Sequence, residues 1–246
     1  MLLSGNTVLV TGGASGIGLA LVERFQRNNN RLIVCGRRES KLAEMRAAHP
    51  SIETRVCDVG EPRQREDLVK WVTTTFPSLN VIVNNAGIQR RVRIAGERDW
   101  KATREEIAIN LEAPVHLTML LLPHLMKQPR AAIVNVTSGL SFVPFAGTPV
   151  YCATKAAIHS FTLSLRHQLV GTSVEVVEVI PPAVDTDLGG PGLHTFGVNV
   201  DEFADAAMKQ ISEGSQEVSY GFAQQASRAS REELDTIFKR MNETGR

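Results

Sequence analysis

Near its N-terminus the chain reads TVLVTGGASGIG over residues 7–18. The apolar residues Thr7–Thr11 are typical of a buried strand, and residues 16–28 predict a helix with one apolar side. Glycines 12, 16 and 18 would permit a tight turn, close approach of a pyrophosphate and close packing of helix on strand. The free N–H groups at the start of such a helix favour a phosphate. An ordinary turn between strand and helix is the alternative, but the placement of the glycines favours a dinucleotide-binding unit.

Strand and helix patterns alternate along the rest of the chain. Further strands are predicted at residues 31–35, 52–57, 81–83, 131–136 and 173–180, and helices at 39–49, 62–76, 103–127, 150–169 and near 232–241. We expect the long fourth helix to bend at Pro123. Because the strands are apolar on both faces, the sequence predicts an α/β fold, a single Rossmann-like domain over 1–246 with a doubly wound parallel sheet. The glycine- and proline-rich segment 181–200 is expected to be a substrate loop.

Composition and charge exclude several classes of protein. The 246 residues carry a formal net charge of +1, which predicts no nucleic-acid partner and no attraction to an anionic membrane. No apolar stretch is long enough to span a bilayer, and the N-terminal residues lack a signal-peptide pattern. Cys35, Cys57 and Cys152 show no CxxC spacing, so we expect no metal site and no disulfide framework. A cytoplasmic location fits these features best.

The end of the second predicted strand indicates which cofactor is bound. An acidic residue there would bind the adenosine ribose of NAD, whereas this chain reads Cys35-Gly36-Arg37-Arg38. Two guanidinium groups favour a 2′-phosphate, and the Ser15 hydroxyl would add a further contact. The alternative is that Arg37 and Arg38 only begin a solvated helix. We predict NADP(H) in preference to NAD(H).

Three side chains predict carbonyl chemistry. Tyr151 and Lys155 are four residues apart, which places them on one face of a helix, and Ser138 lies thirteen residues before Tyr151. A phenol has an ordinary pKa of about 10, and a nearby cation favours the phenolate. Ser138 and Tyr151 could both direct hydroxyl groups at one developing oxyanion. A tyrosine packed in the core is the alternative for Tyr151.

With these motifs in this order, the chain resembles the short-chain dehydrogenase/reductase superfamily over nearly its full length. Within it, the chain is most similar to bacterial oxidoreductases of the DltE type, through SGNT (4–7), CGRR (35–38), NNAGIQ (84–89), SLRHQL (164–169) and GLHTFG (192–197). The resemblance implies that Tyr151 is the general acid and base, that Lys155 lowers its pKa and binds the nicotinamide ribose, and that Ser138 orients the carbonyl. It also implies that Asn110 holds a water linking Lys155 to solvent. A bond from Asn110 to its own backbone is the alternative.

The resemblance also implies a set of cofactor contacts. Asp58 would face the adenine, residues 84–87 would line the adenosine side and support the sheet, and Thr186 would bind the carboxamide. The full cofactor-binding set is Gly12, Ser15, Gly16, Ile17, Gly18, Arg37, Arg38, Asp58, Val59, Asn84, Ala86, Gly87, Tyr151, Lys155, Pro181, Val184 and Thr186. One departure is Pro182, which follows Pro181 where the superfamily usually has glycine; it would stiffen the turn over the nicotinamide.

We therefore predict an NADPH-dependent carbonyl reductase, reversible as an alcohol dehydrogenase, that acts on a small hydrophobic ketone or aldehyde. The expected pocket wall is Leu140, Val143, Phe145, Pro182, Val184, Leu188, Leu193 and Phe196. The alternatives are a biosynthetic oxidoreductase for a sugar or acyl intermediate, and a non-catalytic NADP-binding regulatory protein.

The remaining charged residues have less specific interpretations. His194 lies in the predicted substrate loop and is a candidate pocket residue, whereas His116, His124, His159 and His167 fall on the long helices, where packing or an interface is expected. A charged run is expected to form a solvated face, with contact to an anionic substrate as the alternative. It comprises Arg90, Arg91, Arg93, Glu97, Arg98, Asp99, Lys101, Arg104, Glu105 and Glu106.

The two long helices carry apolar residues on more than one face, which predicts a homodimer or homotetramer through these helices. The alternative is that the surplus packs under the 181–200 loop or the C-terminal helix. The apolar residues concerned are Leu117, Leu120, Leu121, Leu122, Leu125, Ile158, Phe161, Leu163 and Leu165.

Overall fold

The structure, a computed structural model, describes residues 1–96 and 99–243; Glu97 and Arg98 of the charged run lie outside the described residues. It contains a seven-stranded parallel sheet with the strand order β3-β2-β1-β4-β5-β6-β7. This confirms the predicted Rossmann-like, doubly wound fold. The strands are β1 (Thr7–Thr11), β2 (Arg31–Gly36), β3 (Glu53–Val56), β4 (Leu79–Asn84), β5 (Ala131–Val136), β6 (Val174–Ile180) and β7 (Glu217–Ser219).

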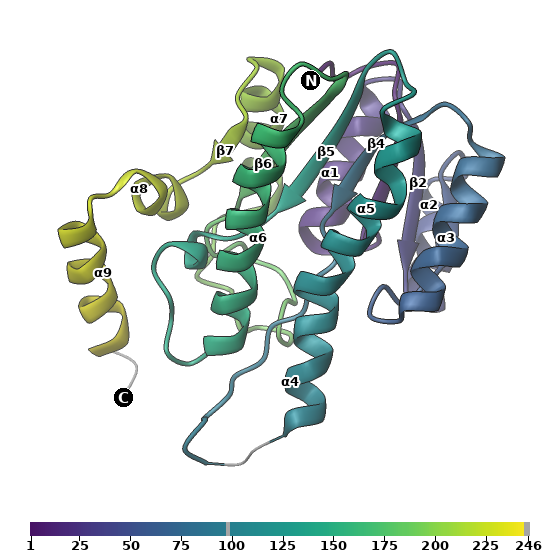
Figure 1. Ribbon diagram of the computed structural model, residues 1–246. Helices are drawn as coiled ribbons and strands as arrows, with labels where there is room; N and C mark the ends of the chain where they lie inside the picture. Colours follow the sequence, from purple (N-terminus) through teal and green to yellow (C-terminus); the bar gives the residue numbers. More distant parts are fainter. Residues whose placement is uncertain (97–98, 244–246) are drawn as a thin grey trace.

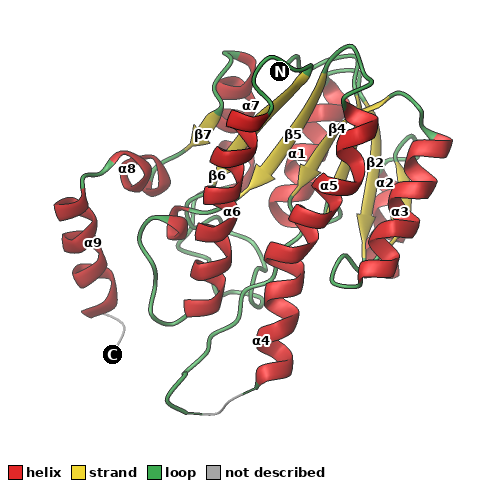
Figure 2. Cartoon of the chain, in the orientation of Figure 1, coloured by secondary structure: helices red, strands yellow, loops and turns green. Residues whose placement is uncertain are grey.

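Helices cover both faces of the sheet (Figure 1, Figure 2). Helices α1, α2 and α7 pack on one face, and α3, α5 and α6 pack on the other. The α-helices are α1 (Gly16–Arg27), α2 (Glu39–Ala48), α3 (Pro62–Thr75), α4 (Trp100–Ile107), α5 (Ala113–Leu125), α6 (Pro149–Gln168), α7 (Val200–Ser212), α8 (Phe222–Arg228) and α9 (Arg231–Glu243). Within the described residues, no helix combines the length and the apolar character needed to cross a membrane.

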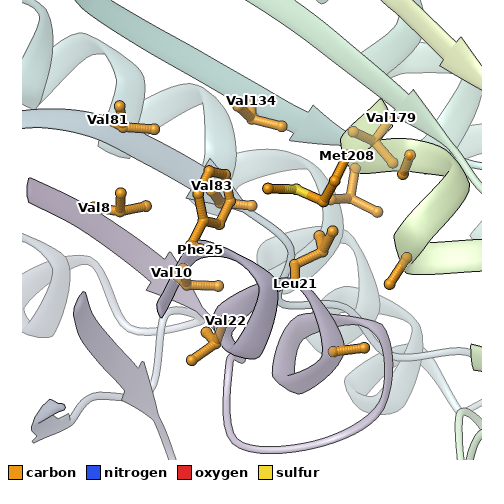
Figure 3. Close-up of a cluster of buried hydrophobic side chains, with 14 of the residues drawn as sticks. Val8, Val10, Leu21, Val22, Phe25, Val81, Val83, Val134, Val179 and Met208 are labelled. Atoms are coloured by element: carbon orange, nitrogen blue, oxygen red, sulfur yellow. The ribbon is translucent and has the colours of Figure 1, made fainter. Parts of the chain in front are cut away.

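The alternation of side chains along each strand divides the core into two layers. Val8 and Val10 of β1 point toward α1, where they meet Leu21 and Phe25 (Figure 3). Leu9, between them, belongs to the cluster under α3, α5 and α6. Because both faces of the strand are covered, β1 is buried at every position, as the sequence pattern predicted.

The long helix predicted at residues 103–127 is three segments. Asp99 caps α4 by accepting a hydrogen bond from the Ala102 N–H at 2.9 Å, so the helix begins earlier than predicted. A π-helical segment, Ala108–Glu112, joins α4 to α5 and contains Asn110. The interruption therefore lies at this segment, and Pro123 is in the last turn of α5. Such π-helical insertions occur frequently at functional sites.

Strand β1 pairs with β2 on one side and with β4 on the other, so the strand order reverses at β1. In open α/β sheets, ligands bind in the crevice outside the carboxyl ends of the strands at such a reversal. The glycine turn follows β1, the motif at residues 84–87 begins at the last residue of β4, and Ser138 follows β5. The topology thus brings three sequence motifs together at the carboxyl ends of neighbouring strands.

Candidate active site

The glycine turn has the backbone that its sequence predicted. Gly12 and Gly16 have φ angles of +65° and +54°, a region that residues with a side chain rarely adopt. Gly18 is required for a different reason, because a Cβ atom there would lie 2.4 Å from Asn85 Nδ2 and 2.5 Å from the Gly12 carbonyl oxygen. Ser15 is the N-cap residue of α1, whose first N–H groups point out of the helix end. A cradle of main chain at a helix N-terminus fits a pyrophosphate.

Two side chains hold this turn in place: Asn85, which belongs to the motif expected at residues 84–87, and Thr11, for which the sequence analysis gave no role. Asn85 Nδ2 donates to the carbonyl oxygens of Thr11 and Gly12 at 2.9 and 3.2 Å. The Thr11 hydroxyl accepts hydrogen bonds from the N–H groups of Asn85 and Ala86, each at 3.0 Å. These contacts tie β4 to the turn after β1 across more than seventy residues of sequence. No local pattern in Asn-Asn-Ala-Gly predicts that Asn85 fixes the glycine turn; only the resemblance to a family indicates a function for this motif.

The two arginines after β2 lie in different environments. Arg38 Nη2 donates to the Ser15 hydroxyl at 2.9 Å, so Arg38 and Ser15 lie together beside the glycine turn. Arg37 instead pairs with Glu105 on α4 at 2.7 Å, and Glu105 also pairs with Arg90 at 2.6 Å. The Arg37 guanidinium, followed by Arg90, lowers the pKa of the Glu105 carboxyl. The two predicted phosphate ligands are therefore not equivalent.

The other predicted cofactor residues fall into two groups. Near the crevice, a Cβ on Gly16 would lie 3.4 Å from Thr186 Cγ2, and one on Gly87 would lie 3.7 Å from Lys155 Nζ. The Ile17 side chain is partly buried against the core. Asp58 Oδ1 accepts a hydrogen bond from the Gly60 N–H at 2.9 Å. The Pro181 carbonyl oxygen accepts one from the Gly139 N–H at 2.9 Å.

The second group has buried side chains. Val59 and Val184 are 6% and 4% exposed and pack in the two core layers, which leaves their main chains to contact a cofactor. Asn84 Nδ2 donates to Asn135 Oδ1 at 2.9 Å and lies 3.4 Å from the Thr118 hydroxyl. The Asn84 side chain thus supports the sheet, which is one of the two roles that the sequence interpretation gave to its motif.

The three catalytic candidates converge at the carboxyl end of β5. Ser138, Tyr151 and Lys155 are buried, and the Ser138 hydroxyl acts on Tyr151 in the direction that lowers the pKa of the phenol. The Ser138 oxygen also accepts from the Leu140 N–H at 3.1 Å. Lys155 Nζ donates to the Val136 carbonyl oxygen at 2.8 Å and lies 5.7 Å from the centre of the Tyr151 ring. Tyr151 is thus part of a polar cluster and not only of the core.

Burial controls the acidity of both groups on α6. It raises the pKa of Tyr151 above its ordinary value, an effect that the hydrogen bond from Ser138 opposes and the Cys152 and Glu106 groups reinforce. Burial lowers the pKa of Lys155 to about 8. The sequence analysis expected the cation to bring the phenol toward neutral pH. In the protein alone, desolvation outweighs that effect, because it disfavours the charged form of either group.

Asn110 links the π-helical segment to the residues after β4. Its Oδ1 accepts from the Ile88 N–H at 2.9 Å, and its Nδ2 donates to the Ile88 carbonyl oxygen at 2.8 Å. Nδ2 also approaches the Thr154 hydroxyl at 3.3 Å. The side chain therefore bonds a neighbouring segment and not its own backbone. Asn110 thus links Ile88 to Thr154 of α6, the residue directly before Lys155.

The expectation that the charged run at residues 90–106 forms a solvated face is wrong for Glu106. The residue is 0% exposed, whereas Glu105 beside it is on the surface. Its Oε1 accepts from the Arg90 N–H at 3.1 Å, and its Oε2 has no partner within residues 1–96 and 99–243. Desolvation raises the pKa of this carboxyl, and its field also acts on Tyr151. A run of alternating charges gives no sign of which carboxylate is buried.

The expected pocket wall is only partly correct. Val143 belongs to a small cluster with Ala226 of α8 and Ile237 of α9 and is 1% exposed. Val184 is in the main core, so neither valine can form a pocket surface in this structure. Leu193 and Phe196 lie in the 181–200 loop and are 44% and 77% exposed. Leu140, Phe145, Pro182, Leu188 and His194 have intermediate exposure and stay candidates.

Comparisons with known proteins agree with this geometry. A sequence model of the family described as short chain dehydrogenase matches residues 6–194. The chain is 48% identical over 248 residues to the uncharacterized oxidoreductase DltE of Bacillus subtilis (strain 168), covering 98% of each chain. A short-chain dehydrogenase from Burkholderia cenocepacia J2315 in complex with NADP has a TM-score of 0.84 at 25% identity and covers 97% of this chain and 99% of its own. One from Burkholderia phymatum in complex with NAD has a TM-score of 0.83 at 21% identity, covering 96% of each chain, which shows the fold alone.

Proposed function

Because this chain belongs to the short-chain dehydrogenase family and is an oxidoreductase of the DltE type, we propose that it is an NADPH-dependent carbonyl reductase, reversible as an alcohol dehydrogenase. The observation that carries the proposal is the convergence of Ser138, Tyr151 and Lys155 at the carboxyl end of the sheet, the end at which the glycine turn also lies. A protein that only bound the cofactor would have no need of a phenol and a hydroxyl at one point.

Nicotinamide, when bound, supplies the hydride for reduction and accepts it in oxidation. The Ser138 oxygen accepts from the Leu140 N–H, and its own hydrogen acts toward Tyr151 in the protein alone. When a substrate is bound, this hydrogen would be donated to the carbonyl oxygen instead. Tyr151 donates the proton that the developing alkoxide needs. Its raised pKa keeps the phenol protonated at neutral pH, which is the form required for reduction.

Lys155 restores the balance of charge when Tyr151 gives up its proton. The ammonium group lies 5.7 Å from the centre of the Tyr151 ring and is held by the Val136 carbonyl oxygen. A cation at this distance in a site of low dielectric stabilises a phenolate. Asn110, held to Ile88, keeps the neighbouring main chain in place and is proposed to position the water through which Lys155 reaches solvent.

NADP is proposed in preference to NAD because Arg38 and Ser15 lie together beside the glycine turn and no acidic residue ends β2. The proposed substrate is a small hydrophobic ketone or aldehyde, since Leu140, Phe145, Leu193 and Phe196 lie in the segments that follow Ser138 and Pro181. A panel of aryl ketones, keto esters and sugars distinguishes this class from a sugar or acyl intermediate. The free thiols of Cys35, Cys57 and Cys152 support a cytoplasmic location.

The direct test of this function is Tyr151→Phe. The ring still packs, so the dissociation constant for NADPH should stay within a few-fold of wild type, while turnover falls by about 10²–10⁴-fold because the proton is lost. NADPH oxidation with the best carbonyl substrate of the panel measures turnover, and fluorescence titration measures binding. Turnover close to that of wild type would remove Tyr151 from the mechanism.

We also propose that the protein is a homo-oligomer through α5 and α6. Leu117, Leu121 and Ile158 are buried under these helices, but Met119 and Leu163 on the outer faces are 66% and 40% exposed. An exposed apolar surface on paired helices suits an isologous contact. Light scattering should give the mass of a dimer or tetramer, whereas a monomer at micromolar concentration would rule the interface out.

A further inference from the structure

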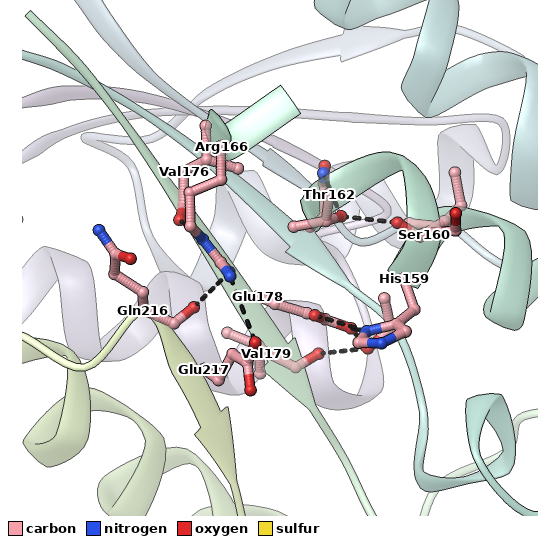
Figure 4. Close-up of polar contacts among 12 residues, drawn as sticks. His159, Ser160, Thr162, Arg166, Val176, Glu178, Val179, Gln216 and Glu217 are labelled. Carbon is pink, nitrogen blue, oxygen red and sulfur yellow. Dashed lines mark hydrogen bonds and ion pairs between the residues drawn. The ribbon is translucent and has the colours of Figure 1, made fainter. Parts of the chain in front are cut away.

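A buried carboxylate, that of Glu178, and a histidine, His159, form a pair (Figure 4). Glu178 is on β6 and is 0% exposed. His159 Nδ1, on α6, lies 3.0 and 2.9 Å from the two carboxylate oxygens of Glu178. Taking a carboxylate out of water is costly unless it is paired and hydrogen-bonded, so a fully buried glutamate in a sheet of apolar strands needs an explanation.

The third member of the network is the residue directly before Ser138. The Thr137 hydroxyl donates to Glu178 Oε1 at 2.7 Å, and the Thr137 N–H donates to the Val179 carbonyl oxygen at 2.8 Å. Both the side chain and the main chain of Thr137 are therefore attached to β6. Holding Thr137 fixes the peptide unit that joins it to Ser138, and with it the direction in which the Ser138 hydroxyl leaves the backbone.

The histidine also supports the segment on the other side of Ser138. Ser138 caps the short helix Gly139–Ser141, and Phe142 follows it. The rings of Phe142 and His159 meet edge to face, with their centres 4.6 Å apart. His159 thus supports the chain on both sides of Ser138. It contacts Phe142, after Ser138, directly. It is connected to Thr137, before Ser138, through Glu178.

We propose that Glu178 and His159 are positioning residues that set the orientation of Ser138 through Thr137. This inference rests on the proposed function, in which Ser138 donates to the carbonyl oxygen. The pair does not touch a substrate. Its effect is geometric: a displacement of a catalytic group by about 1 Å can cost about 100-fold in rate.

The pair is also sensitive to pH. Glu178 raises the pKa of His159, mainly through their hydrogen bond. The charged groups that act on His159 are Glu178 on β6, Glu217 on β7, which adds to the effect, and Arg166 on α6, which opposes it. A raised histidine pKa contributes stability that is fully present below the ordinary value of 6.5 and is lost as the pH rises through the raised value. Above that pH His159 is neutral, and its hydrogen bond to Glu178 is weaker. Glu178 is then held less firmly, and so is Thr137, which donates to it.

The test compares variants that differ in one contact. Thr137→Val removes the hydroxyl and should lower kcat by about 10- to 100-fold with little change in the dissociation constant for NADPH, whereas Thr137→Ser keeps the hydroxyl and should restore most of the rate. His159→Asn removes the imidazole, so the pH dependence that the imidazole causes should disappear. This loss should be seen both in kcat and in the melting temperature of the cofactor-free protein. His167→Asn, on the exposed end of the same helix, is the matched control. The probes are NADPH and the best carbonyl substrate of the panel.

The outcomes separate this inference from the function on which it rests. If Thr137→Val and His159→Asn keep kcat within twofold of wild type while Tyr151→Phe is inactive, the positioning role is wrong and the proposed function stands. If Thr137→Ser is as slow as Thr137→Val, the hydroxyl contact with Glu178 is not what matters and the inference falls. If Tyr151→Phe is fully active, the function fails and the inference fails with it. The two threonine variants leave Glu178 itself unchanged, so they decide the question without the risk that the loss of a buried carboxylate prevents folding.

Discussion

Substitution of Arg38 tests how the proposed cofactor preference arises. Among the residues that the structure describes, Arg38 Nη2 bonds only a neutral hydroxyl, that of Ser15 at 2.9 Å, so both groups can turn to a phosphate at little cost. A hydrogen bond to a charged group contributes about 1.5–3 kcal/mol, which is about 10- to 150-fold in binding. Since Arg38 is exposed and its interactions are screened, we expect the lower half of that range. Arg38→Ala should therefore reduce the ratio of kcat/KM for NADPH to that for NADH by about tenfold, mainly through KM.

Arg37 should contribute less to the same ratio. Its guanidinium is already paired with Glu105 at 2.7 Å, and it must leave this partner, wholly or in part, to bind a phosphate. Exposed ion pairs are worth about 0.2–1 kcal/mol, so this competition lowers the net contribution of Arg37 by up to about fivefold. Glu105→Gln should release Arg37 and increase the preference for NADPH by a similar factor.

Steady-state kinetics with both cofactors at one ionic strength, together with fluorescence titration of each cofactor, measure these effects. Arg27→Ala, which removes an equal charge at the opposite end of α1, should leave the ratio unchanged. If Arg38→Ala keeps the wild-type ratio of kcat/KM for NADPH to that for NADH while Arg37→Ala lowers it, the phosphate binds Arg37 by displacing Glu105 from it. A wild-type preference for NADH would refute the assignment of both arginines.

Two further predictions concern Lys155 and Gly18. Because burial lowers the pKa of Lys155 to about 8, its ammonium is lost as the pH rises through that value, so kcat/KM for NADPH should fall by about tenfold per pH unit above it. Lys155→Arg, which stays charged, should remove this limb, and a wild-type profile flat to pH 10 would contradict the role of the ammonium. In Gly18→Ala the new Cβ would meet Asn85 Nδ2 at 2.4 Å, which should cost about 1–3 kcal/mol and lower the melting temperature by roughly 2–12 °C. Gly36→Ala, whose Cβ would meet only Leu42 at 3.9 Å, is the control for calorimetry, and equal melting temperatures for the two variants would contradict the close approach.

Much of the fold could be predicted because its signals are local. A strand covered on both faces is mostly apolar, and the strands at β1, β5 and β6 were predicted to within one residue. Helix α7 was missed although it carries an N-terminal signal, since Asn199 caps it by accepting from the N–H groups of Asp201 and Glu202. Strand β7 has only three residues, Glu217–Ser219, too few for a pattern to be recognised. It is defined by pairing with β6 and not by its own sequence.

The candidate site divides in the same way. The glycines and the spacing of Tyr151 and Lys155 are visible in the sequence because each concerns one turn or one helix face. The burial of Glu106 and the exposure of Glu105 are not visible, because two adjacent glutamates on a helix differ only in what packs against them. The pairing of Arg37 with Glu105 joins residues 68 positions apart, and no local pattern indicates it.

The sequence by itself determined that a strand ends in a glycine turn at a helix start, and that a phenol, an ammonium and a serine hydroxyl are available for carbonyl chemistry. It did so because backbone conformation and helical spacing depend on neighbouring residues. Only the tertiary structure decided the acidity of those groups and their support, because desolvation and hydrogen bonding depend on what lies around a side chain in space. The sharpest case is Glu178, which meets Thr137 and His159 only when β5, β6 and α6 come together.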